Sequence, residues 1–164
     1  MYNKHNLAVA KIASKSSIKP GLTAVAFCGN KTVATDSFRL IEVSTCHGEE
    51  PTAPVLVPAS KVSRLKLIKD SFAVLSEVGT PIDETFPDYA PIMEAAEKRE
   101  CVTFKVNGVL LYETLKLLAD VGGKAPWVTM SVPLQKGSPI ILNVRNHKTN
   151  QTAKALVMPM LDNK

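Results

Sequence analysis

The sequence predicts an α+β fold in which helices pack on one side of antiparallel sheets, with three helices and about nine strands. Short stretches of alternating apolar and polar residues, separated by turn residues, are typical of antiparallel strands. Three longer stretches repeat apolar residues with a period near 3.6, as amphipathic helices do. The 164 residues are 45% apolar and 21% charged, which is ordinary for a folded globular chain.

The chain opens with a predicted helix over residues 4–17, in which Val9, Ile12 and Ala13 share an apolar side. At about 100° per residue, three basic residues fall within roughly 40° of arc on the opposite side. These three are Lys4, Lys11 and Lys15. These three lysines form a basic stripe along the helix. Two interpretations of this stripe stay open: it is a solvated helix face, or it is a surface that contacts phosphates.

An antiparallel meander is predicted next, over residues 22–27, 31–36 and 38–44, with a hairpin signal at Gly29-Asn30. A further strand, "PVLVP", leads into a second predicted helix, "ASKVSRLKLIKD". The basic residues of this helix spread more widely around its axis, so they make a weaker stripe. They are Lys61, Arg64, Lys66 and Lys69.

Residues 71–78 alternate as another strand, and the proline-rich stretch 79–94 predicts an extended connector. The charged residues at 94–100 mark the expected boundary between two subdomains. The predicted domains are therefore residues 1–93 and residues 94–164.

The second subdomain begins with a predicted strand over 101–106 and the clearest helix of the chain, over 107–123. This helix has Leu111, Leu115 and Leu118 on one face, and the Gly122-Gly123 pair ends it. Three further strands follow, "WVTMSVPL", "PIILNVR" and "TAKALVMPM". Helix and meander thus come in a similar order in both halves, which favours a repeated unit.

Composition excludes several functional classes. No apolar run is long enough to cross a bilayer and the first residues lack a signal-peptide core, so a cytoplasmic protein without a membrane partner is expected. Cys28, Cys46 and Cys101 are widely spaced, and the three histidines show no ligand spacing, so neither a metal nor another cofactor is expected. The net charge of +5 favours a polyanion or an acidic protein as partner.

Catalysis is not expected either. Asp36-Ser37, Asp83-Glu84 and Asp88 supply carboxylates and a hydroxyl, but no G-x-S-x-G motif and no nearby histidine base accompany them. Asp36 is expected instead to accept hydrogen bonds from local backbone N–H groups and to shape a turn.

Four fragments together resemble one family, the bacterial DNA sliding clamps, which are the ring-shaped β subunits of the replicative polymerase. "TVATDSFRL" resembles the A-T-D-G-H-R-L signature of the clamp middle domain, and "VLVPASKVSRL" is similar to the strand and helix that follow it. "FPDYAPIM" resembles the F-P-D-Y-x-x-V-x-P connector, and "VMPML" is close to the terminal V-M-P-M-R-L. The order is that of the family, and the match covers most of the chain. Residues 1–93 resemble the middle domain and the rest resembles the second half of the last domain.

The resemblance implies an apolar cleft that receives short linear peptides from DNA polymerases, clamp loaders and repair proteins. The sequence departs from the family at Ser37-Phe38, where Gly-His is usual, and at Leu161, where the family has Arg. The implied cleft residues are Thr35, Ser37, Phe38, Arg39, Leu40, Pro87, Ile92, Leu156, Val157, Met158, Pro159 and Met160.

The resemblance also implies contact between the basic helices and double-stranded DNA, without sequence preference, from Lys4, Lys11, Lys15, Lys61, Arg64, Lys66 and Lys69. Family rings have six domains and twelve helices, so a chain with three helices would need four copies to close one. The alternative hypothesis is a clamp mimic or adaptor, of a phage or mobile-element type, that forms no ring and modulates host replication proteins.

Overall fold

The computed structural model describes residues 1–16, 18–46, 49–68, 71–123, 126–135 and 137–160. It is an α+β structure with antiparallel sheets, as the sequence predicts, and its described residues form seven strands and five α-helices. The chain divides into two compact units, Met1–Ala96 and Glu97–Lys164. The division falls three residues after the boundary expected from the charged segment.

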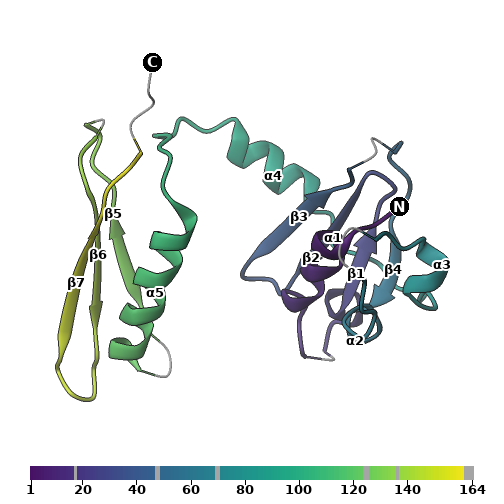
Figure 1. The fold of residues 1–164 in the computed structure, drawn as a ribbon, viewed down its shortest axis with the longest axis horizontal. Coiled ribbons are helices and arrows are strands. Elements are labelled where there is room, and N and C mark those ends of the chain that lie inside the picture. The colour runs from purple at the N-terminus through teal and green to yellow at the C-terminus, as the bar shows by residue number, and fades with distance from the viewer. Residues whose placement is uncertain (17, 47–48, 69–70, 124–125, 136, 161–164) are drawn as a thin grey trace. The chain divides into compact units, whose positions relative to one another are not determined.

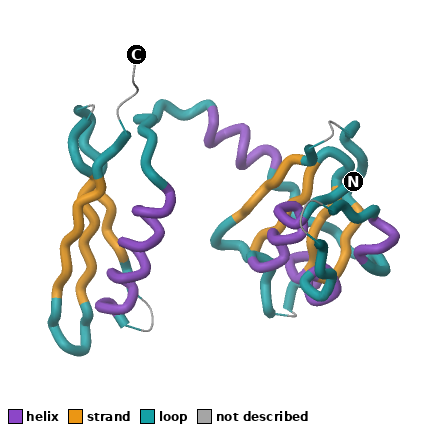
Figure 2. The backbone as a smooth tube through the Cα atoms, viewed as in Figure 1, coloured by secondary structure: helices purple, strands orange, loops and turns teal. Residues whose placement is uncertain are grey.

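A four-stranded antiparallel sheet forms the centre of the first unit (Figures 1 and 2). Its strand order is β3-β2-β1-β4, and the expected hairpin at Gly29-Asn30 joins β1 to β2. Gly29 has a φ of 72°, a left-handed conformation that glycine adopts without steric cost. The strands are β1 Ala24–Phe27, β2 Lys31–Thr35, β3 Leu40–Ser44 and β4 Val55–Pro58.

Helices cover one face of this sheet. They lie over a core that includes Val25, Phe27 and Val57, and α1 contributes Leu7 to it. Asn3 caps the first helix, because its Oδ1 accepts the N–H groups of His5 and Asn6. The short helices of this unit are α1 Lys4–Ala8, the 3₁₀ turns η1 Val9–Lys11 and η2 Pro20–Thr23, α2 Ala59–Val62 and α3 Leu75–Val78.

The opposite face of the same sheet is covered by the connector. Ile82, Phe86 and Tyr89 pack there on Ala26 and Val33. Because β1 is buried on both faces, all four of its residues are apolar and they do not alternate with polar ones.

Several predicted elements of this unit are wrong. The predicted first helix ends at Lys11, because the Ser14 and Ser16 hydroxyls accept local backbone N–H groups and compete with helical hydrogen bonds. The predicted second helix ends at Val62, and Leu65 and Leu67 then alternate with exposed neighbours as in an extended chain.

The region that follows also differs from the prediction. Residues 71–78 form a bridge at Ala73 and the short helix α3 where a strand was expected. The connector is extended only up to Tyr89, after which α4 runs over Ala90–Glu97. Pro91 is compatible with that helix because a proline in the first turn removes no intrahelical hydrogen bond.

The second unit is simpler. Helix α5, Gly108–Gly122, lies along one face of a three-stranded antiparallel sheet of order β5-β6-β7 (Figure 1). Leu118 packs on Ile140, Leu142 and Val144, and Leu111 and Leu115 join that core, as predicted. Residues 101–106 form a single bridge, Lys105 to Met160, in place of the expected strand. The strands are β5 Val128–Ser131, β6 Ile140–Arg145 and β7 Thr152–Val157.

Candidate functional site

The first segment of the expected cleft is the turn between β2 and β3. Asp36 organises it: Oδ1 accepts the backbone N–H groups of Phe38 and Arg39, both at 3.0 Å. Oδ2 accepts a hydrogen bond from Arg39 Nε at 3.0 Å, and Thr35 Oγ1 donates to the Arg39 carbonyl at 2.9 Å. The prediction that Asp36 shapes this turn is confirmed.

These contacts also set the acidity of Asp36. Burial acts to raise the pKa of its carboxyl, but the hydrogen bonds from Phe38 and Arg39 outweigh burial, so the pKa lies below the ordinary 3.8. The carboxylate therefore stays ionised and holds the Arg39 guanidinium beside it. Ser37 has a φ of 78°, a left-handed conformation that side chains rarely adopt.

The turn presents one aromatic ring to solvent. Phe38 is 97% exposed, so its ring fills no hollow of the first unit. Leu40, two residues later, is half-buried and packs on the same apolar cluster as Phe86 and Tyr89 of the connector. The structure thus brings two expected cleft segments, the turn and the connector, to one face of the sheet.

A polar contact fixes the connector to the sheet. Tyr89 OH donates to Glu42 Oε2 at 2.9 Å, and Lys31 Nζ binds the same oxygen at 2.9 Å. Burial is the main cause that raises the pKa of the Tyr89 hydroxyl, so it remains a donor to Glu42. Next to this anchor Pro87 is exposed, and Ile92 is 71% exposed on α4.

The remaining cleft residues belong to the second unit, in β7 and the tail that follows it. Leu156, Met158 and Met160 are exposed and Pro159 is half-buried. Val157 is only 4% exposed and packs in the core under α5, because successive residues of a strand point to opposite faces. Its side chain is therefore part of the core and not of the surface.

The tail forms one wall of an apolar groove, which we call the tail groove. The Met160 N–H donates to the Lys105 carbonyl at 2.7 Å and so holds the tail against residues 102–105. The groove has a cavity volume of about 390 Å³. Its lining residues are Val102, Thr103, Phe104, Lys105, Val132, Pro133, Leu134, Gln135, Gly137, Ser138, Ile140, Pro159 and Met160.

Most of this lining was missed in the sequence. The sequence pattern predicts an ordinary strand at residues 101–106 and places Pro133 and Leu134 at the end of another, and neither pattern indicates a site. The signal was the crowding of large apolar residues at segments that form no regular strand: Val102, Phe104 and Leu134 are all exposed. Exposed apolar side chains gathered around a groove mark binding surfaces.

Only some of the expected DNA-binding residues lie close to one another in the structure. Lys4 and Lys11 line one hollow of about 280 Å³ together with Ser63 and Leu65. Lys61, Arg64 and Lys66 are exposed on the chain segment that forms the other side of this hollow. Lys15, Arg64 and Lys66 lie outside the helices in which they were predicted, and Lys69 lies outside the described residues.

Within the described parts of the chain, no three His, Cys, Asp or Glu side chains gather as a possible metal site. The three cysteines are free thiols, of which Cys28 is buried. None of the described helices is long and apolar enough to cross a membrane. Comparison with protein-family models, with curated proteins and with solved structures gives no match to this chain.

Proposed function

We propose that this chain is a clamp-like, non-enzymatic cytoplasmic protein of DNA replication or repair. It binds short linear peptides of DNA polymerases, clamp loaders or repair proteins in an apolar cleft, and it contacts double-stranded DNA without sequence preference. One observation carries the proposal. Pro159 and Met160, which the family resemblance assigns to peptide binding, line an apolar groove whose other wall contains Phe104.

The chemistry of the groove suits a short apolar peptide. Met160 is 59% exposed, so much of its side chain is available to a ligand. A methionine thioether adapts to ligands of different shape, whereas Pro133 and Pro159 give rigid walls. A volume of about 390 Å³ lies at the lower end for ligand sites and suits one or two large side chains.

The turn at Asp36 supports the same assignment. Sliding clamps have glycine where this chain has Ser37, and Ser37 holds the left-handed backbone conformation that glycine favours. The exposed Phe38 ring and the Arg39 side chain lie at the tip of this turn, where they are open to a partner. The turn therefore offers a second contact surface for a peptide.

A binding titration tests the proposal. A fluorescein-labelled peptide of the Gln-Leu-x-Leu-Phe kind is titrated with the full chain and followed by anisotropy. Saturable binding is expected, and a peptide with both leucines and the phenylalanine replaced by serine should not bind, because the apolar side chains fill the groove. Equal binding of the two peptides would refute the proposal.

Assembly separates the two forms that the function could take. A ring pairs sheet edges between copies, and the edge strands of the two described sheets are β3, β4, β5 and β7. The alternative, a clamp mimic or adaptor that modulates host replication proteins, needs no such pairing. Light scattering at high concentration distinguishes them, because a ring requires a closed oligomer and the adaptor remains a monomer.

A further inference from the structure

One face of the sheet in the second unit is not covered by α5. Strand alternation places Thr129, Asn143 and Lys154 on it, and the strand register aligns these three across β5, β6 and β7. Arg145 and Thr152 form the next paired row. This set, together with Trp127 and His147, is called the open face below.

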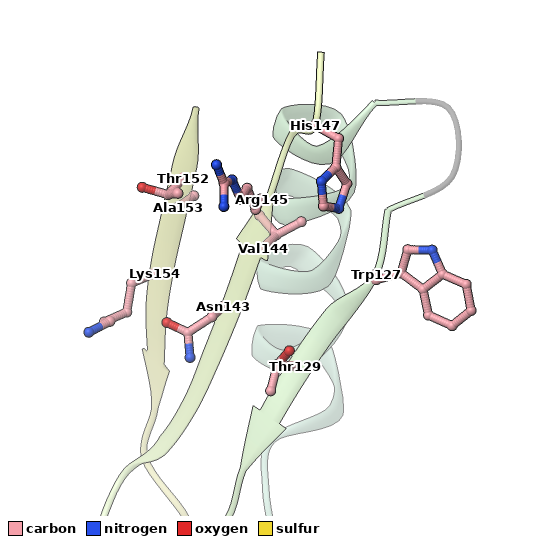
Figure 3. A pocket seen from close by; sticks show the side chains of 9 residues that line it. All are labelled: Trp127, Thr129, Asn143, Val144, Arg145, His147, Thr152, Ala153 and Lys154. Carbon is pink, nitrogen blue, oxygen red and sulfur yellow. The ribbon is translucent and has the colours of Figure 1, made fainter. Parts of the chain in front are cut away.

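The open face is hollowed and polar. Figure 3 shows its side chains on the strands, with α5 behind them. They line a hollow of about 480 Å³. Arg145 Nη2 donates to Asn150 Oδ1 at 3.1 Å, which orients the guanidinium at the end of β6.

Trp127 is the only tryptophan of the chain, and it is 82% exposed. It directly precedes β5 and lies two residues before Thr129, so strand alternation continues the open face to it. Burial of an indole ring contributes more stabilising free energy than burial of most other side chains, and a ring this exposed does not gain that free energy. Its exposure on the face that also carries Arg145 and Lys154 therefore indicates a ligand with flat rings.

Charge is distributed unevenly between the two units. Residues 1–96 contain ten basic residues (Lys or Arg) and ten acidic residues (Asp or Glu). Residues 97–164 contain ten basic residues but only five acidic ones. The whole net charge of +5 therefore belongs to the second unit. Between Asp120 and Asp162 the sequence has no acidic residue at all, so the strands of this sheet carry charge of one sign.

From these observations we infer that the open face binds single-stranded nucleic acid. Arg145 and Lys154 bind phosphates, Trp127 stacks on a base, and Asn143 and Thr129 supply polar contacts between them. An exposed aromatic ring on a basic sheet surface suits unpaired bases, because the bases of a duplex are already stacked on each other. This inference concerns a surface separate from the tail groove and from the lysines of the first unit, and it does not depend on the peptide proposal.

The single tryptophan provides a direct assay. Oligothymidylate of about 12 nucleotides is titrated into the full chain while Trp127 fluorescence is recorded. Quenching that saturates and weakens with salt is expected, with a slope near −1.4 in log–log form for two phosphate contacts on a single strand. Absence of quenching at low salt, or tighter binding of a duplex of the same length, would overturn the inference.

Variants identify the residues, with a fluorescein-labelled oligonucleotide as probe. Trp127→Ala should weaken binding roughly 5- to 150-fold, the range for loss of one stacked base, whereas Trp127→Phe should retain most of the affinity. Arg145→Ala with Lys154→Ala should remove most of the salt dependence. Lys19→Ala with Lys116→Ala removes two charges elsewhere and should bind as wild type does.

Two results would contradict the assignment. One is equal affinity of wild type and the Arg145→Ala, Lys154→Ala variant. The other is equal loss in the Lys19→Ala, Lys116→Ala control, which would mean that only net charge matters. Peptide binding in the tail groove should be unchanged in all these variants, so failure of this inference and failure of the peptide proposal are distinguishable.

Discussion

Replacing Met160 by alanine should weaken peptide binding by a calculable amount. Its side chain is 59% exposed, and a peptide in the tail groove would cover that part. Complete burial of a methionine side chain contributes about 1.5–3 kcal/mol, so the part still exposed contributes about 1–2 kcal/mol. The dissociation constant of the peptide should therefore rise about 5- to 30-fold.

Anisotropy of the labelled Gln-Leu-x-Leu-Phe peptide measures this change. Met130→Ala is the matched control, because Met130 is also partly exposed in the second unit but does not line the tail groove. Its affinity for the peptide should equal that of wild type. If Met160→Ala binds as tightly as wild type, the peptide does not contact the groove and the assignment is wrong. Adding Arg39→Ala to Met160→Ala tests whether the turn in the first unit contributes further.

Three further predictions concern the first unit. Replacing Lys4, Lys11 and Lys15 together by glutamate should abolish salt-sensitive retention of duplex DNA, measured by filter binding, and unchanged retention would leave these lysines as a solvated face. Folding lowers the pKa of the Asp36 carboxyl below its ordinary value of 3.8. The ionised carboxylate therefore contributes its full stabilising free energy above pH 3.8, and this contribution is lost as the pH falls through the pKa of the folded state. The amide NMR signals of the turn should therefore titrate with a midpoint below 3.8 in wild type and not at all in Asp36→Asn, and a midpoint above 3.8 would contradict this. Asn6 is fully buried and donates hydrogen bonds to the carbonyls of Val43 and Ser44. Asn6→Ala should therefore lower the free energy of unfolding, measured by urea denaturation, by about 1–3 kcal/mol. A decrease of less than about 0.5 kcal/mol would refute this prediction.

Elements with a strong periodic pattern could be predicted from the sequence. Helix α5 begins and ends where its signals lie: Asn107 Oδ1 accepts the N–H groups of Val109 and Leu110, and Gly123 follows with a positive φ. The strands β1 to β7 lie inside the predicted segments, because apolar runs bounded by turn residues favour antiparallel strands.

Short helices could not be predicted with the same success. The apolar spacing of residues 4–17 is helical throughout, yet serine hydroxyls end the helix by binding local N–H groups. In "SFAVLSEV", the β-forming composition predicts a strand, but Glu77 Oε2 accepts the Val74 N–H and starts a single helical turn. Such local side-chain hydrogen bonds set where a short helix begins or ends, but they leave little trace in the spacing of apolar residues.

The candidate sites show a similar limit. The resemblance assigned Pro159 and Met160, but the opposite wall of the tail groove depends on the bridge from Lys105 to Met160, a pairing between residues far apart in sequence. The open face depends in the same way on the register of β5, β6 and β7, which places Arg145 and Lys154 on one surface. These pairings join residues far apart in the sequence, and local sequence patterns do not predict them.

Methionine-methyl NMR shows whether the peptide enters the tail groove. The chain has five methionines, and Met1 and Met130 lie outside the tail groove. With labelled methyl groups, the Gln-Leu-x-Leu-Phe peptide should shift the Met160 signal in a saturable way and leave those of Met1 and Met130 unchanged. A Met160 signal that stays unchanged while the peptide binds would mean that the peptide binds outside the tail groove.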